Sequence, residues 1–151
     1  MSVVDTETLI AAPPGAVWNV VMDPARLGEW VTIHRGVRDV SDGRPHVGFE
    51  MNQTIHLRGV NFHVRWELTE CDPPHRALWE GRGPARSRAH IEYLLQPENG
   101  GTRFHYRNEF NPPLGPLGAA ASRALVGGIS EREAQRSLEQ LKALLESMAG
   151  R

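Results

Sequence analysis

The chain has 151 residues, a formal net charge of −1 and one cysteine. This length is typical of one domain with its own core, so we expect a single domain over residues 1–151. The near-neutral charge and the lack of a Lys or Arg run give no support to nucleic acid as a partner, and one cysteine excludes an internal disulfide.

The sequence shows no targeting or membrane-spanning segment. No apolar stretch is long enough to cross a bilayer, and the N-terminus lacks a basic segment followed by an apolar one. We therefore expect a cytoplasmic protein without a membrane span. The sequence neither requires nor excludes a homo-oligomer.

The first predicted element is a strand at 4–10, followed by two short helices. Pro13-Pro14 ends the strand and opens the first helix, because proline suits the first turn of a helix. Asp23 is placed to cap the second helix, which runs to about Trp30.

Six strand-like runs follow, and turn-rich segments separate them. Short separators imply antiparallel hairpins, since a parallel pair would need a crossover of a dozen or more residues. We predict a meander with hairpin turns at Arg58-Gly59 or Gly59-Val60 and at Gly100-Gly101. The runs are 31–40, 47–57, 60–70, 76–81, 85–96 and 102–110.

Alternation along three strands predicts which face meets the core. The residues that alternate with the inward-facing ones include charged side chains such as Arg65 and Glu67, which indicates that the other face of the sheet is exposed to solvent. The faces of Trp79 and Glu80 cannot be assigned from the pattern. The predicted inward sets are Phe49, Met51, Ile55 and Leu57; Phe62, Val64, Trp66 and Leu68; and Phe104, Tyr106 and Phe110.

One long helix is predicted from Leu117 almost to the C-terminus. Its second half carries an apolar stripe of Leu138, Leu141, Leu145 and Met148. The small side chains at 118–122 cannot fill the space opposite them, which suggests a cavity. Glycines 127 and 128 suggest a kink or a close approach by another group.

Several stretches carry a likeness to a known family. They are Ile10-Ala11-Ala12-Pro13-Pro14 before Val17-Trp18, Asp23-Pro24 before Trp30, the segment Leu68-Thr69-Glu70-Cys71-Asp72-Pro73-Pro74, and Gly101-Thr102-Arg103-Phe104. With this order of elements, the chain resembles the helix-grip fold of the START-related superfamily and, within it, the bacterial polyketide cyclase/dehydratase-like (SRPBCC) proteins.

The resemblance implies an α+β fold. A curved antiparallel sheet of about seven strands would wrap around the long C-terminal helix, with two short helices after the first strand. In relatives the cavity between sheet and helix holds lipids, hormones, polyketides or other apolar molecules. The resemblance implies no catalytic motif, because the group shares none.

Candidate site residues are polar or aromatic side chains on the inward parity. Gln53, Tyr93, Tyr106 and Asn108 would suit a ligand carbonyl or hydroxyl, although bonds to neighbours or to buried water explain them equally well. The resemblance places Trp30 near the cavity mouth. The predicted ligand-binding set is Trp30, Gln53, Trp66, Tyr93, Tyr106, Asn108, Leu117, Ala121 and Leu125.

Three functions are compatible with these features. The leading hypothesis is a pocket for a small, largely apolar molecule, such as a lipid, an aromatic or a polyketide-like compound. The second is a cyclase/dehydratase-type enzyme using the same pocket, with His34, Tyr106 and Asn108 as catalytic candidates. The third is a protein-interaction module.

No cofactor or metal is predicted. His56 and His63 lie close together across the predicted hairpin, but zinc needs three or four ligands and the pattern brings no further one near.

Overall fold

The computed structural model describes residues 1–149. Strand β1 (Ser2–Ile10) is followed by helix α1 (Pro14–Val21), the 3-10 helix η1 (Pro24–Glu29) and strand β2 (His34–Arg38). Then come β3 (Glu50–Leu57), β4 (Val60–Asp72), β5 (Arg76–Arg82), the 3-10 turn η2 (Pro84–Arg86), β6 (Arg88–Glu98) and β7 (Gly101–Asn111). Helices α2 (Ala119–Leu125) and α3 (Glu131–Ala149) complete the described chain.

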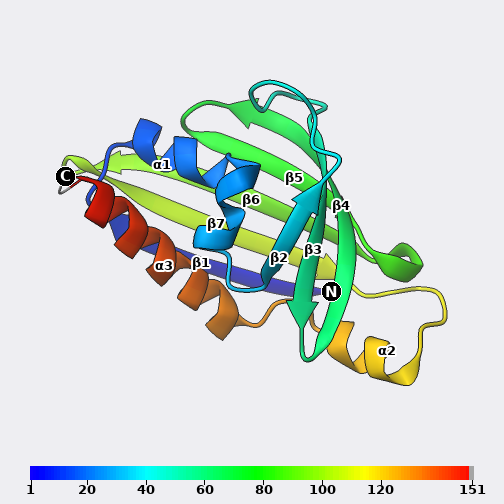
Figure 1. The fold of residues 1–151 in the computed structure, drawn as a ribbon. Coiled ribbons are helices and arrows are strands. Elements are labelled where there is room, and N and C mark those ends of the chain that lie inside the picture. Colours follow the sequence, from blue (N-terminus) through cyan, green and yellow to red (C-terminus); the bar gives the residue numbers. More distant parts are fainter. Residues whose placement is uncertain (150–151) are drawn as a thin grey trace.

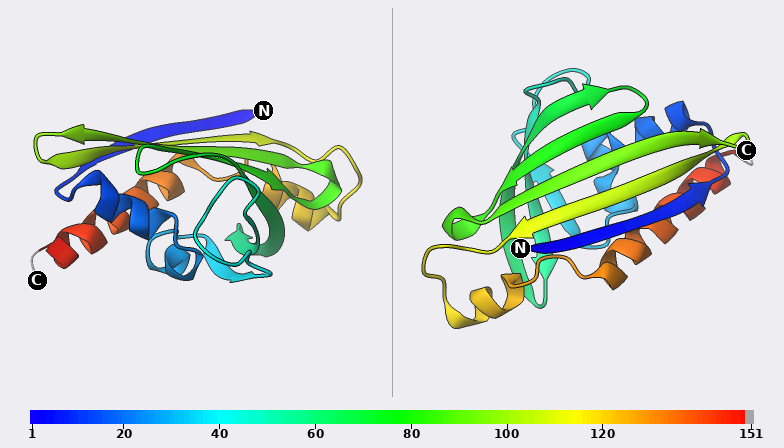
Figure 2. Two further views of the ribbon diagram at one scale, coloured as in Figure 1. Left: turned by 90° about the horizontal axis from the view of Figure 1, so that it is seen from above. Right: turned by 180° about the vertical axis from the view of Figure 1, so that it is seen from behind.

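The strands form one antiparallel sheet. Within residues 1–149 it has seven strands in the order β1-β7-β6-β5-β4-β3-β2, so β2 to β7 form a meander and β1 pairs with β7. The sheet curls, and the helices lie on its concave side (Figures 1 and 2). The predicted α+β, helix-grip-like architecture is confirmed.

Local turn chemistry sets the strand register. Arg58 and Gly59 have φ of 47° and 85°, the left-handed pair that a two-residue type I′ hairpin requires. Leu57 and Val60 therefore pair directly. The last hairpin turns at Asn99-Gly100, one residue before the predicted position, since Gly101 already belongs to β7.

The predicted alternation is confirmed. Every residue of the three inward sets is buried, except Ile55 and Phe110, which are half-buried. Trp79 joins the core at 4 % exposure, opposite Leu68, while Glu80 faces solvent. A β-bulge between Leu68 and Glu70 shifts the register of that strand pair.

Three predicted strands begin too early: the runs 31–40, 47–57 and 85–96 start as strands only at His34, Glu50 and Arg88. The run 31–40 contributes only β2, because the chain turns before it and the His34 N–H donates to the Val31 carbonyl. The run 85–96 begins as a strand only at Arg88. Pro84, which has no N–H for a sheet, opens η2 instead, and the next two residues have positive φ.

The predicted single C-terminal helix is two helices. Gly127 and Gly128 have φ of 86° and 62°, so the chain leaves the helical conformation between α2 and α3. A Cβ at Gly128 would lie 2.8 Å from the Phe110 ring, which confirms the predicted close approach. Ser130 then caps α3 by accepting a bond from the Glu133 N–H.

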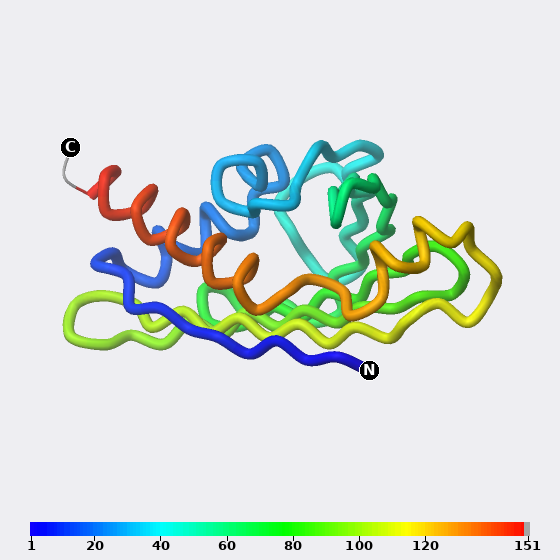
Figure 3. Tube along the Cα trace, turned by 90° about the horizontal axis from the view of Figure 1, so that it is seen from below, coloured from blue at the N-terminus to red at the C-terminus, as the bar shows by residue number. Residues whose placement is uncertain are grey.

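Helix α3 packs along the β1 side of the concave face (Figure 3). Its buried stripe is Ala134, Leu138, Leu141 and Leu145, and each buried leucine stabilises the fold by about 1.5–3 kcal/mol. Met148, predicted in the stripe, is 37 % exposed. The short α2 lies apart from α3, at the end of the sheet far from the C-terminus (Figures 1 and 3).

Substituting Gly128 tests this division. Gly128→Ala should lower the free energy of unfolding by about 2–5 kcal/mol, since left-handed strain adds to a clash with Phe110. Gly127→Ala is the matched control, because its Cβ would meet nothing within 4 Å, and it should cost only about 1–2 kcal/mol. Denaturant unfolding measures both. Equal losses of unfolding free energy in the two variants would show that the contact with Phe110 does not contribute to stability.

Candidate functional site

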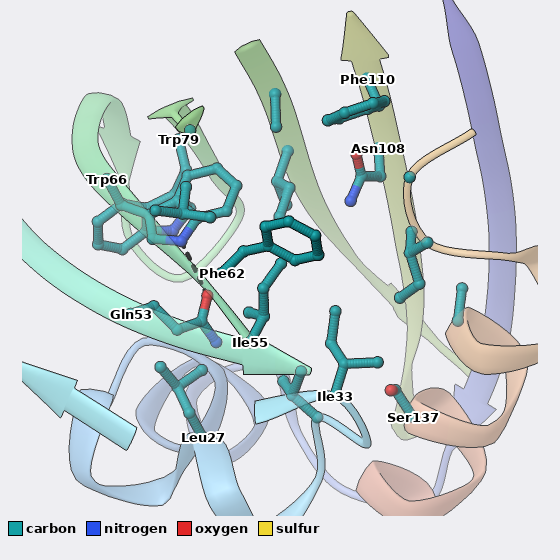
Figure 4. A pocket seen from close by; sticks show the side chains of 18 of the residues that line it. Leu27, Ile33, Gln53, Ile55, Phe62, Trp66, Trp79, Asn108, Phe110 and Ser137 are labelled. Carbon is teal, nitrogen blue, oxygen red and sulfur yellow. Dashed lines mark hydrogen bonds between the residues drawn. The ribbon is translucent and has the colours of Figure 1, made fainter. Parts of the chain in front are cut away.

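A largely apolar cavity of about 100 Å³ lies between the concave sheet and the helical side (Figure 4). The sheet contributes residues of β3 to β7, and the other wall comes from η1, the segment after it, and the α2–α3 region. Among its apolar lining residues are Met22, Leu27, Ile33, Ile55, Phe62, Trp79, Ile91, Phe110 and Ile129.

One polar wall is a chain of three side chains. The Trp66 indole N–H donates to Gln53 Oε1 at 2.8 Å, and Gln53 Nε2 lies 2.9 Å from His34 Nδ1. Because the amide nitrogen can only donate, His34 Nδ1 accepts and its proton sits on Nε2. Burial, and then the charge of Arg35, lower the pKa of His34, which is therefore neutral at physiological pH.

Gly81 makes room for the Trp66 ring. The two residues pair across β4 and β5, and a Cβ at Gly81 would lie 2.6–2.9 Å from three ring carbons. The ring therefore lies over the glycine, an orientation in which its N–H reaches Gln53. This close packing holds the polar chain in one geometry.

The second polar wall lies on β6 and β7. The Asn108 amide donates to the Tyr106 hydroxyl at 2.9 Å, and Tyr93 pairs with Tyr106 across the strands, with ring centroids 6.2 Å apart. Within residues 1–149 no side chain hydrogen-bonds the Tyr93 hydroxyl. Burial raises the pKa of Tyr106 to about 12 and that of Tyr93 well above its ordinary value of 10. Both hydroxyls therefore remain protonated donors.

Trp30 lies inside the molecule rather than at a mouth. It is 1 % exposed, and its ring packs edge-on against Tyr93 and Phe104 at centroid distances of 6.0 and 6.2 Å. Its indole N–H is buried and has no hydrogen-bond partner in the described part of the chain. The prediction that Trp30 lies near the cavity mouth was therefore wrong, because the residue lies on the inner wall of the cavity.

Seven of the nine residues predicted to bind a ligand line this cavity: Trp30, Gln53, Trp66, Tyr93, Tyr106, Asn108 and Leu125. Leu117 and Ala121 instead pack on a small cluster that includes Leu57 and Phe62. His34 contacts the wall through Gln53. That these residues bind a ligand stays a prediction.

Sequence analysis missed two parts of the wall. Trp79 was left unassigned because its strand pattern is ambiguous. Ser137 lies within the apolar stripe of α3 and is 4 % exposed, and its hydroxyl accepts from the Thr32 N–H at 3.1 Å. A serine four residues before Leu141, on the buried side of the helix, was the signal that could have revealed it.

The histidines of the β3–β4 hairpin have other partners. His56 Nδ1 lies 2.7 Å from Asn61 Oδ1, and His63 Nδ1 lies 3.1 Å from the Thr54 hydroxyl. Residues 1–149 contain no group of three or more His, Cys, Asp or Glu arranged to hold a metal. In the same range, no helix is both long and apolar enough to cross a membrane.

One family model and several curated proteins match this chain. The model of the family described as "Polyketide cyclase / dehydrase and lipid transport" matches residues 1–146. The uncharacterized protein Rv1546 of Mycobacterium tuberculosis is 29 % identical over 146 residues, covering 95 % of this chain and 99 % of that protein. The toxin Rv0910 of the same organism is 23 % identical over 124 residues, covering 81 % and 86 %.

Solved structures share the fold. TTHA0849 from Thermus thermophilus matches with a TM-score of 0.75 at 20 % identity, covering 97 % of this chain and 98 % of that one.

Removing the central amide tests the Trp66–Gln53 bond. Gln53→Leu leaves a buried indole N–H unpaired and should lower the free energy of unfolding by about 1–3 kcal/mol. Adding Trp66→Phe removes the unpaired indole N–H. The double variant should therefore lose less unfolding free energy than the sum of the losses in the two single variants. A double-mutant cycle from denaturant unfolding measures the coupling. Strict additivity would contradict a shared bond.

The depressed pKa of His34 predicts a pH dependence. Between the ordinary value of 6.5 and the lower folded pKa, the unfolded chain binds the proton more readily, so stability falls as pH falls through this window. Above 6.5 the contribution is fully present. Unfolding free energies measured from pH 7.5 downward should therefore decline less steeply in His34→Gln than in the wild type. Parallel curves would contradict the assignment, and His63→Gln, on the exposed outer face, serves as the control.

Proposed function

The chain belongs to the polyketide cyclase/dehydrase and lipid transport family, and on this premise we propose that its pocket binds a small, largely apolar molecule that carries an oxygen acceptor. One observation carries the proposal: the Tyr93 hydroxyl, a protonated donor with no side-chain partner within residues 1–149, lies on the wall of an apolar cavity. A ligand oxygen would accept a hydrogen bond from it. Trp30 lines the same cavity, and its buried indole N–H has no partner in the described chain, a state that costs about 1–3 kcal/mol.

The size of the cavity limits the ligand. The open volume is about 100 Å³, and an engineered apolar cavity of about 150 Å³ holds one benzene molecule. A single ring or a short acyl chain matches this space. A longer lipid would enter only if the segment 111–130, which bounds one end of the cavity, moved outward.

The distribution of polar groups sets the orientation of the ligand. Gln53 is already engaged on both sides, by Trp66 and by His34. Tyr93 has no such partner in the described chain, and the Tyr106 hydroxyl accepts one bond while keeping its own proton to donate. The ligand oxygen would therefore lie toward β6 and β7, and its apolar part toward Leu27, Phe62 and neighbouring side chains.

A cyclase/dehydratase-type enzyme is the second candidate, favoured by the family description and by the two protonated tyrosines. A tyrosine could donate to a substrate carbonyl as it enolises. The neutral His34 could accept a proton at Nδ1 only if Gln53 moved away from it. Turnover lost in Tyr93→Phe at unchanged affinity would favour this candidate over simple binding.

Native mass spectrometry provides the first test. Purified protein should carry a small apolar molecule that is absent after denaturation and solvent extraction. If none co-purifies, a thermal-shift screen of aromatic and short-chain acyl compounds should find stabilising ligands, because a ligand that binds only the folded state raises its apparent stability. A screen without any stabilising compound would contradict the proposal.

Tyr93→Phe tests the polar contact. It should weaken binding of such a ligand about 2- to 13-fold, the effect of one hydrogen bond worth about 0.5–1.5 kcal/mol. Thr54→Val removes a hydroxyl from the opposite face of the same sheet and should leave affinity unchanged. Ala89→Phe places a benzyl group into the cavity and should abolish binding while the fold persists. Unaltered affinity in Ala89→Phe would place the site elsewhere.

A further inference from the structure

Three segments distant in sequence converge at the end of the molecule that carries α2. The Arg58 guanidinium, in the β3–β4 turn, donates to the carbonyls of Ala124 and Gly128 at 2.6 and 3.0 Å. The Leu114 N–H donates to the Ala85 carbonyl at 2.8 Å, which ties the segment after β7 to the β5–β6 connection. Figures 1 and 2 show these segments together, at the end far from the C-terminus.

This end is basic. The segments 56–61, 82–90 and 111–130 contain no aspartate or glutamate, and we call them together the basic end. None of its arginines takes part in an ion pair within residues 1–149, whereas Arg76, Arg103 and Arg107 on the outer sheet face are each paired with carboxylates. The arginines of the basic end are Arg58, Arg82, Arg86, Arg88 and Arg123.

Two of these charges lie opposite each other at a cost to the fold. Arg82 and Arg88 are direct partners across β5 and β6, and like charges in that position are destabilising. A carboxylate at either position would relieve the repulsion. Neither arginine forms an ion pair within residues 1–149, so both charges are open to an external anion.

Apolar side chains project from the same end. Leu114 is 80 % exposed and Val126 is 60 % exposed, and both belong to the segment between β7 and α3. The β2–β3 loop also exposes two valines, but there two aspartates, at 39 and 42, accompany the arginines at 38 and 44. Leu114 and Val126 are the exposed large apolar side chains of the three basic-end segments, which contain no acidic residue.

We propose that the basic end docks on the surface of an anionic phospholipid bilayer. Its arginines would contact lipid phosphates, while Leu114 and Val126 enter the interface. Nucleic acid would also attract the arginines, but it offers nothing to projecting aliphatic side chains. Pro84, Leu125 and Gly128 line the cavity at this same end, so docking would bring the pocket next to the lipid.

Vesicle co-sedimentation tests this inference with the purified full chain. Partition to vesicles containing phosphatidylglycerol should exceed partition to pure phosphatidylcholine and fall as salt rises, because each arginine near an anionic surface contributes about fivefold and is screened. Arg86→Glu/Arg123→Glu should weaken partition at least about 25-fold. Arg38→Glu/Arg44→Glu, at the β2–β3 connection, makes the same change in net charge and should have little effect.

Three results would overturn the inference. The first is equal partition to the two vesicle types, and the second is an equal loss of vesicle partition in the two charge-reversal variants. The third is binding to a nucleic acid duplex that is tighter than binding to vesicles at the same salt and that Leu114→Ser does not change. On vesicles, Leu114→Ser should instead weaken partition and preserve the salt dependence. Thermal melts confirm that each variant is folded. Because no pocket ligand is used, the outcome is independent of the binding function proposed above.

Discussion

The contact between Gly128 and Phe110 divides the C-terminal third of the chain. Phe110 occupies the space that a side chain at position 128 would need, and the two glycines turn the chain with positive φ. Helix α3 can therefore begin only at the Ser130 cap and pack along β1. The rest of the concave face is covered by η1, the segment after it and the residues that follow α2, and the cavity lies between them and the sheet. The small side chains at 118–122 do not line it, so the prediction that they face a cavity was wrong. The cavity is the consequence of this division.

Burial decides the chemistry of the cavity wall. It lowers the pKa of His34, so this side chain is neutral, and it raises the pKa values of Tyr93 and Tyr106 further above the ordinary value of 10, at which both hydroxyls are already protonated near neutral pH. Ionised side chains pair instead on the outer face, as Arg103 does with Glu98 and Glu7. Apart from Arg88 at its border, such a wall offers uncharged hydrogen-bond donors, which suit an uncharged oxygen on an apolar molecule.

The inner wall and the basic end use polar groups in opposite ways. The Trp66–Gln53–His34 chain is satisfied internally and fixes one geometry, whereas the arginines around α2 have no carboxylate partners in the described chain. Arg58 is the exception within the basic end, because it binds the carbonyls that close α2. It holds the α2 segment over the cavity while contributing to the surface charge.

The sequence by itself determined the architecture and most of the wall, because strand parity, hairpin glycines and the helical stripe are local patterns that tertiary packing followed. Phe62, Trp66 and Tyr106 could be placed inward from alternation alone, and Gln53 was visible as a polar interruption. Tertiary structure alone decided the face of Trp79, the break between α2 and α3, the partners of Gln53 and the inner position of Trp30. The five arginines of the basic end form no run in the sequence. Each of these features depends on which atoms of distant segments come within a few ångströms, and no local periodicity encodes that distance.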